Sequence, residues 1–226
     1  MTTTLVTGAN KGLGLETTRR LIEAGHTVYA GMRDLSTGEA ARALGAVPVQ
    51  LDVTDDASVA RAVASLTELD VLINNAGIPG TKWDFDDLDA DEMRTVFETN
   101  VFGVVRMTQA ALPLLRRSSA PVIVNVTSGV GWPRLLLDEK ADEFPVNLVP
   151  YASSKAAVIA LTVQYAKNLP KFRINASDPG YTATDFNGRS GHQTVTEGTD
   201  ATVALALIGP DGPTGEFRNR HGLITY

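Results

Sequence analysis

The 226-residue chain contains no cysteine, which excludes disulfides, thiolate nucleophiles and thiolate metal sites. Only three histidines are present and they do not cluster, so we expect no metal site. No apolar run approaches the roughly 18 residues of a membrane-spanning helix, and neither a basic nor a long apolar leader precedes Gly8. The net charge of −6, without a long basic run, argues against nucleic acid or an anionic membrane as a main partner. These absences predict a cytoplasmic protein.

What is present is the composition of an ordinary globular protein. The hydrophobic fraction is 43% and the charged fraction is 20%, without repeats, low-complexity segments or linkers. A chain of this length fits one domain that buries a substantial core. We therefore expect a single domain over residues 1–226.

The glycine-rich stretch Thr7–Gly14 follows a short apolar strand pattern and runs directly into a helical pattern over 15–24. A strand, a glycine turn and a helix start, in that order, form a phosphate cradle. Gly8 permits the tight turn, Gly12 lets the backbone approach a pyrophosphate, and Gly14 lets the helix pack on its strand. The N–H groups and dipole of the new helix favour an anion. Three glycines also occur in purely structural turns, so this interpretation needs support from the rest of the chain.

Short apolar runs alternate with helical patterns along the whole sequence. Beyond the first strand, the runs that read as strands are 27–31, 47–51, 70–73, 122–126, 173–176 and one in the tail over 215–226. Alternation of this kind is typical of an α/β, doubly wound parallel sheet with helices on both faces. We expect a Rossmann-like sheet of about seven strands in the order 3-2-1-4-5-6-7.

Four further motifs follow the glycine stretch in a fixed order. Asn74–Gly77 reads N-N-A-G after the fourth strand, Asn100 interrupts a helical pattern, and Ser128 follows the fifth strand. Tyr151 and Lys155 are four residues apart and share one face of a helix. Each motif alone is common, but chance explains the ordered set poorly. With T-G-A-N-K-G-L-G, the set resembles the short-chain dehydrogenase/reductase family, single-domain type, and leans toward its carbonyl-reductase-like members.

The resemblance implies a catalytic set of Asn100, Ser128, Tyr151 and Lys155. Tyr151 would donate a proton to the substrate oxygen, and Ser128 would orient the carbonyl. Lys155, together with the oxidised nicotinamide, would stabilise the phenolate and lower the pKa of the tyrosine. Asn100 would sit at an irregular point of its helix and hold a water that relays protons.

The resemblance also implies a set of cofactor-binding residues. They are Gly8, Asn10, Lys11, Gly12, Leu13, Gly14, Arg33, Asp52, Val53, Asn74, Ala76, Gly77, Tyr151, Lys155, Pro179, Gly180, Thr182 and Thr184. Thr182 stands where the family has a branched apolar residue.

The residues that follow the second strand bear on which nicotinamide cofactor is used. Family members that prefer NAD carry an acid where this chain has Met32. Arg33 and Lys11 match the two basic positions of NADP-preferring members, and two cations would favour a 2′-phosphate. The alternative is that both are solvated surface charges, and Asp34 beside Arg33 complicates the pattern. We expect NADP(H).

The predicted function is NADPH-dependent reduction of a ketone or aldehyde of a small apolar substrate to an alcohol. A catalytically idle NADP(H) sensor or scaffold is the alternative, although such a protein usually lacks one of the serine, tyrosine and lysine residues. The resemblance also favours a homo-oligomer, either a dimer or a tetramer.

Two segments are expected near the substrate. Residues 185–195 match the substrate loop, and the segment 132–149 reads as an insertion that we expect over the active site. Trp83 and Phe85 lie in a polar loop, where they either line the substrate mouth or pack the loop; packing is favoured slightly.

Overall fold

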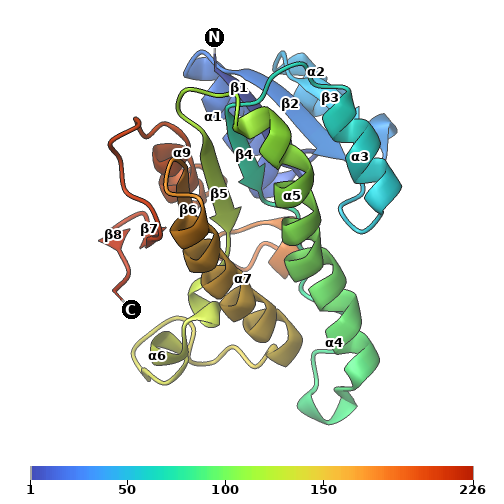
Figure 1. The fold of residues 1–226 in the computed structure, drawn as a ribbon. Coiled ribbons are helices and arrows are strands. Elements are labelled where there is room, and N and C mark those ends of the chain that lie inside the picture. The colour runs from blue at the N-terminus through green and yellow to red at the C-terminus, as the bar shows by residue number, and fades with distance from the viewer. Residues whose placement is uncertain (1, 226) are drawn as a thin grey trace.

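The computed structural model describes residues 2–225, which carry one sheet of eight strands in the order β3-β2-β1-β4-β5-β6-β7-β8 (Figure 1). The strands are β1 (Thr3–Thr7), β2 (Thr27–Met32), β3 (Val47–Gln50), β4 (Val71–Asn74), β5 (Val122–Val126), β6 (Arg173–Ser177), β7 (Phe217–Asn219) and β8 (Gly222–Leu223). Every pair is parallel except β7 with β8, which is antiparallel. The expected order of the first seven strands is confirmed.

The tail differs from the single strand that the sequence suggested. The Asn219 side chain accepts a hydrogen bond from the His221 N–H at 2.9 Å, and Gly222 has φ of +125°. This tight turn reverses the chain, so the tail forms two short strands in place of one. The reversal is local and affects only the edge of the sheet, far along the strand order from the cofactor cradle.

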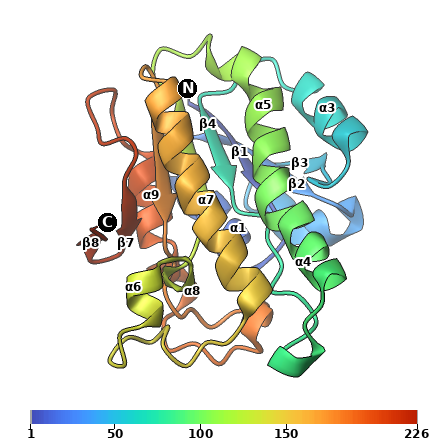
Figure 2. The ribbon, with the colours of Figure 1, turned by 60° about the horizontal axis from the view of Figure 1, so that its bottom comes forward.

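Helices cover both faces of the sheet, as a doubly wound fold requires (Figure 2). They are α1 (Gly12–Glu23), α2 (Glu39–Ala43), α3 (Asp56–Ala64), α4 (Ala90–Phe97), α5 (Gly103–Leu115), α6 (Pro133–Leu136), α7 (Val149–Asn168), α8 (Val195–Gly198) and α9 (Asp200–Ala206). Helices α3, α5 and α7 pack with one apolar core, and α1, α2 and α9 pack with another on the opposite face. No helix within residues 2–225 is both long and apolar enough to cross a bilayer.

The central strands explain why the fold places its site where it does. All residues of β1, β4 and β5 are buried, because helices lie on both sides of them. The carboxyl ends of these three strands lie together at one end of the sheet. The strand order reverses between β1 and β4, which leaves a crevice at the carboxyl ends of these strands, where ligands usually bind in such sheets.

The long helical pattern after Asp89 is divided by a π-helical segment, Glu98–Phe102, that joins α4 to α5. This segment carries Asn100, so the local irregularity expected around that residue is confirmed. A π-helical turn inserts an extra residue into the helix and redirects nearby side chains. Asn100 is thereby turned inward and is 1% exposed.

Candidate active site

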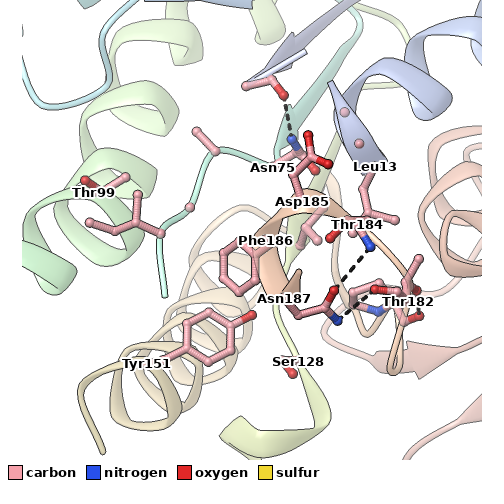
Figure 3. Close-up of a pocket in the computed structure, with 18 of the residues that line it drawn as sticks. Leu13, Asn75, Thr99, Ser128, Tyr151, Thr182, Thr184, Asp185, Phe186 and Asn187 are labelled. Atoms are coloured by element: carbon pink, nitrogen blue, oxygen red, sulfur yellow. Dashed lines mark hydrogen bonds between the residues drawn. The ribbon is translucent and has the colours of Figure 1, made fainter. Parts of the chain in front are cut away.

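A cavity of about 780 Å³ lies at the carboxyl ends of the central strands (Figure 3). It is lined by every predicted site residue except Asn74 and Asn100: Gly8, Asn10, Lys11, Gly12, Leu13, Gly14, Arg33, Asp52, Val53, Ala76, Gly77, Ser128, Tyr151, Lys155, Pro179, Gly180, Thr182 and Thr184. The fold thus brings together residues that span nearly the whole chain.

Backbone geometry makes the glycine stretch a cradle. Gly8 and Gly12 have φ of +65° and +54°, in the left-handed region that favours glycine. A Cβ at Gly14 would lie 2.2 Å from the carbonyl oxygen of Gly8, a distance that no side chain tolerates. At Gly12, by contrast, a Cβ would make only an ordinary van der Waals contact, with Thr184 at 3.8 Å, and Gly12 lines the cavity. The backbone is tightly packed behind the cradle and accessible in front of it.

The start of α1 fits an anionic group. Lys11, its N-cap residue, has an extended backbone and its side chain makes no capping hydrogen bond. The side-chain amide of Asn75 donates to the carbonyl oxygens of Thr7 and Gly8, at 2.8 Å and 3.1 Å, and so holds the turn from behind. N–H groups at a helix start and the helix dipole together attract a phosphate. The cradle therefore fits the pyrophosphate of a dinucleotide.

The two asparagines of N-N-A-G have different positions, and Asn74, which was expected to bind the cofactor, does not line the cavity. Asn74 is 3% exposed and its Nδ2 donates to Oδ1 of Asn125 at 2.8 Å, which links β4 to β5. Asn75 lines the cavity instead. Asn75 follows the last residue of β4, so it lies where the chain leaves the sheet at the cavity.

The catalytic candidates come from β5 and α7. Ser128 follows the end of β5, and Tyr151 and Lys155 lie one turn apart near the start of α7. Lys155 is 5% exposed, and its Nζ donates to the carbonyl oxygen of Val126 at 2.9 Å. The same Nζ lies 5.5 Å from the centre of the Tyr151 ring. Burial lowers the pKa of Lys155 to about 8.

The pKa of Tyr151 does not follow the expected direction. Burial raises it, the Asp178 carboxylate raises it further, and only the hydrogen bond with Ser128 acts the other way. The Lys155 Nζ, which would stabilise the phenolate, donates to the carbonyl oxygen of Val126. The lowering was expected from Lys155 together with the oxidised nicotinamide, and for that combination it stays a prediction.

Asp178 is a buried carboxyl group that the sequence argument did not single out. It is 3% exposed and accepts hydrogen bonds from the N–H groups of Gly180, at 2.9 Å, and Gly129. It thereby connects the turn after β6 to the turn that carries Ser128. Its position immediately before the Pro179-Gly180 turn was the only sequence signal.

Asn100 lies behind the cavity wall. Its Nδ2 donates to the Ile78 carbonyl oxygen and to Ser154 Oγ, both at 2.9 Å, and its Oδ1 accepts from the Ile78 N–H at 2.8 Å. A Cβ at Gly77 would lie 3.3 Å from Asn100 Oδ1 and 3.5 Å from Lys155 Nζ, so both polar atoms border Gly77. Asn100 therefore fastens the loop after β4 to α7 and keeps one oxygen near the lysine.

The loops around the cavity contribute residues that the sequence did not assign. Phe186, from the expected substrate loop, lies with its ring centre 5.3 Å from that of Tyr151. Residues 145–148 of the segment before α7 also line the cavity, whereas α6 does not. Trp83 lines it too and is 57% exposed, so the slightly favoured interpretation of loop packing was wrong for this residue.

Comparison with known proteins agrees with this geometry. A family model described as short chain dehydrogenase matches residues 2–194. The chain belongs to the short-chain dehydrogenase/reductase family. It is an oxidoreductase, and the family's cofactor is a nicotinamide dinucleotide, NAD(H) or NADP(H).

Three relatives show how the similarity is distributed. A (+)-neomenthol dehydrogenase of Capsicum annuum is 33% identical, over 94% of this chain and 94% of that protein. The crystal structure of an NADPH-bound carbonyl reductase from chicken fatty liver has a TM-score of 0.86 at 28% identity, covering 99% of this chain and 98% of that one. A 3-ketoacyl-(acyl-carrier-protein) reductase of Brucella melitensis, complexed with NADH, has a TM-score of 0.84 at 27% identity and covers 96% of both chains.

The short-chain dehydrogenase/reductase described here is shorter than the plant relative. Their alignment runs over 294 positions, whereas this chain has 226 residues. At least 68 of those positions therefore have no counterpart in this chain.

Proposed function

We propose that this chain is an NADP(H)-dependent reductase that converts the carbonyl group of a small apolar substrate into an alcohol. The observation that carries the proposal is that Ser128, Tyr151 and Lys155 line the same cavity as the glycine cradle. A cofactor held by its pyrophosphate at Gly12 would extend along the cavity toward these three side chains.

The protein residues supply the proton and the orientation. When bound, the reduced cofactor supplies the hydride that adds to the carbonyl carbon. Tyr151 gives its phenolic proton to the carbonyl oxygen, so that the product is a neutral alcohol. The raised pKa of this phenol keeps it protonated at neutral pH, which is the form that reduction requires. Ser128 donates to the same oxygen and fixes its direction.

Lys155 and Asn100 serve the proton supply. With a pKa of about 8, Lys155 is charged at neutral pH and stabilises negative charge that develops on the Tyr151 oxygen. Asn100 Oδ1 and Lys155 Nζ both border Gly77, and a water between them would carry protons toward the lysine. The two N–H groups of the Asn100 amide are held by protein, so this side chain is fixed in place.

The preference for NADP(H) is supported by the surroundings of Arg33. Met32, at the position of the acid in NAD-preferring members, is 2% exposed and buried in the core, so no carboxylate stands there. Asp34 accepts a hydrogen bond from the Ser36 N–H at 2.8 Å and caps its own turn. Arg33 and Lys11 both line the cavity with exposed side chains, where a 2′-phosphate would meet them.

An apolar substrate is supported by the other wall of the cavity. Phe186, Val130 and Leu148 line it, together with Ile78 and Trp83. The similarity to a carbonyl reductase and to a neomenthol dehydrogenase supports a ketone or aldehyde as the reacting group.

The experiment that tests the proposal is oxidation of NADPH and NADH, each with a panel of aliphatic and aromatic ketones and aldehydes. Turnover that is selective for NADPH is the expected result. Equal rates with NADH would overturn the cofactor assignment. Tight binding of NADPH without turnover of any carbonyl would favour the sensor or scaffold alternative.

A further inference from the structure

The loop between β4 and α4 presents two large aromatic side chains to solvent. Trp83 is 57% exposed and Phe85 is 68% exposed. Exposed aromatic side chains that adjoin a cavity mark binding surfaces more often than isolated exposed ones do. Trp83 does adjoin one, since it lines the main cavity together with Tyr151.

Hydrogen bonds hold this loop in position. The Glu92 carboxylate accepts hydrogen bonds from the N–H groups of Thr81 and Lys82, the latter at 3.1 Å, and from the Thr81 hydroxyl at 3.1 Å. Lys82 also forms an ion pair with Asp89. The residue on the other side of the tryptophan, Asp84, caps a short turn by accepting from the Asp86 N–H at 3.1 Å. Trp83 is therefore an exposed ring on a fixed backbone, as a binding platform requires.

A second hollow adjoins the main cavity at the tryptophan. It is lined by Trp83 and Phe85 with Asp84 between them, and by Asn147 and Val149 from the opposite segment. Trp83 and Asn147 line both hollows. A molecule whose carbonyl group lies at Tyr151 can therefore continue past Trp83 into the outer hollow.

Charge around this platform restricts the class of molecule. Residues 82–92 contain six carboxylates and one lysine, and Asp84, Asp86 and Asp87 are exposed beside the rings. An anionic substrate tail would be repelled there. An uncharged ring system would pack on the apolar faces of Trp83 and Phe85 without that repulsion.

We propose that Trp83 and the adjoining outer hollow form a substrate subsite for the uncharged apolar ring of a carbonyl compound too long for the inner cavity alone. This inference rests on the proposed reductase function and adds to it the class of substrate. Trp83 contacts the far end of the substrate, so it sets specificity without touching the reacting atoms.

The test compares three ketones. They are cyclohexanone, phenylcyclohexanone with its phenyl group on the ring carbon opposite the carbonyl, and the same phenylcyclohexanone with a carboxylate on its phenyl ring. With NADPH, we expect the lowest KM for the neutral phenyl compound and a higher one for its carboxylate. In Trp83→Ala the KM of phenylcyclohexanone should rise about tenfold, well above any rise in the KM of cyclohexanone, because only the phenyl group reaches the outer hollow. Trp83→Phe keeps an aromatic face, so the KM of phenylcyclohexanone should rise less in this variant. Leu223→Ala removes another half-exposed apolar side chain, which lines neither hollow, and should change the KM of neither ketone.

A binding measurement separates failure of the subsite from failure of the proposed function. Calorimetric titration of the protein–NADP⁺ complex with the product, phenylcyclohexanol, should show affinity about tenfold weaker in Trp83→Ala than in wild type. Equal binding by the two proteins, or an equal rise in KM for both ketones, would overturn the subsite. If no ketone were reduced but the alcohol still bound through Trp83, the reductase assignment alone would fail.

Discussion

The cofactor side and the substrate side of the cavity are built in different ways. The cofactor side is made of backbone: the cradle at residues 8–14 has left-handed glycines and no room for a Cβ at Gly14. The substrate side is made of side chains from three loops, 78–88, 145–148 and 181–190. A backbone cradle recognises a phosphate that all relatives share, whereas side chains on loops are free to change with the substrate.

The largest effect should come from Tyr151→Phe, which removes the proton donor and leaves both sides of the cavity intact. We expect turnover of any accepted ketone to fall by about a hundredfold to ten-thousandfold. NADPH affinity, measured by fluorescence titration, should stay close to wild type, because the cradle does not involve the phenol oxygen. Loss of NADPH binding together with turnover would contradict a purely chemical role.

The next largest effect should come from Gly14→Ala, which disrupts the cofactor side. The new Cβ would lie 2.2 Å from the Gly8 carbonyl oxygen and 2.6 Å from Asn75 Nδ2, so α1 has to move. We expect the free energy of unfolding to fall by about 3 kcal/mol, with NADPH binding strongly weakened. Urea denaturation and cofactor titration measure the two effects.

Gly209→Ala is the matched control for this substitution. A Cβ at Gly209 would meet no atom within 4 Å, so the free energy of unfolding of Gly209→Ala should stay within about 0.5 kcal/mol of wild type. Wild-type NADPH affinity in Gly14→Ala would show that the cradle does not depend on close packing of α1.

A smaller effect should follow from Arg33→Ala, which alters cofactor choice without disturbing the cradle. Loss of a charged contact to the 2′-phosphate should raise the KM for NADPH about tenfold and leave the KM for NADH unchanged. Steady-state kinetics with both cofactors provide the measurement. An equal change for NADPH and NADH would mean that Arg33 is a solvated surface charge.

The smallest effect near neutral pH should be the pH dependence set by Lys155. Its folded pKa of about 8 lies below the usual 10.5, so the charged form persists below about 8 and is lost above it. The kcat/KM for ketone reduction should therefore decline above about pH 8.

Stability should change in the opposite direction over the same range. Between about pH 8 and 10.5 the unfolded chain binds more protons at this lysine than the folded chain, so the free energy of unfolding should rise with pH. Lys155→Met should remove this contribution. A wild-type activity profile that is flat to pH 10.5, or a stability slope that persists in Lys155→Met, would contradict the assignment.

Local sequence patterns predicted the order of the strands and the glycine cradle well. The glycine spacing, the alternation of apolar runs and the four-residue interval between Tyr151 and Lys155 are properties of neighbouring residues. They were sufficient for the order of the first seven strands. The resemblance to the family, rather than these patterns, supplied most of the predicted residues that line the cavity. Such patterns arise because side chains repeat every two residues along a strand and about every 3.6 along a helix, so burial of one face leaves a local periodicity in the sequence.

Residues with two plausible partners could not be assigned in this way. Asn74 and Asn75 are adjacent residues of the same type, so the sequence does not distinguish them. In the fold, Asn74 is the one that hydrogen-bonds to Asn125 on the neighbouring strand β5. Glu92 has the spacing of a capping-box residue after Asp89, and Asp89 does accept its N–H at 2.9 Å. The carboxylate of Glu92 instead holds the loop at Thr81 and Lys82, and this contact fixes where Trp83 lies.

The sequence by itself determined the fold class and the glycine cradle, and it indicated Ser128, Tyr151 and Lys155 as the catalytic candidates, because each depends on short spacings along the chain. Only the tertiary structure decided the direction in which the Tyr151 pKa shifts. Folding buries the phenol, and it brings the Asp178 carboxylate close although Asp178 lies 27 positions along the chain. The tertiary structure also decided the shape of the substrate side, where loops from three parts of the chain meet. Burial and long-range contacts exist only after folding, so no local pattern encodes them separately.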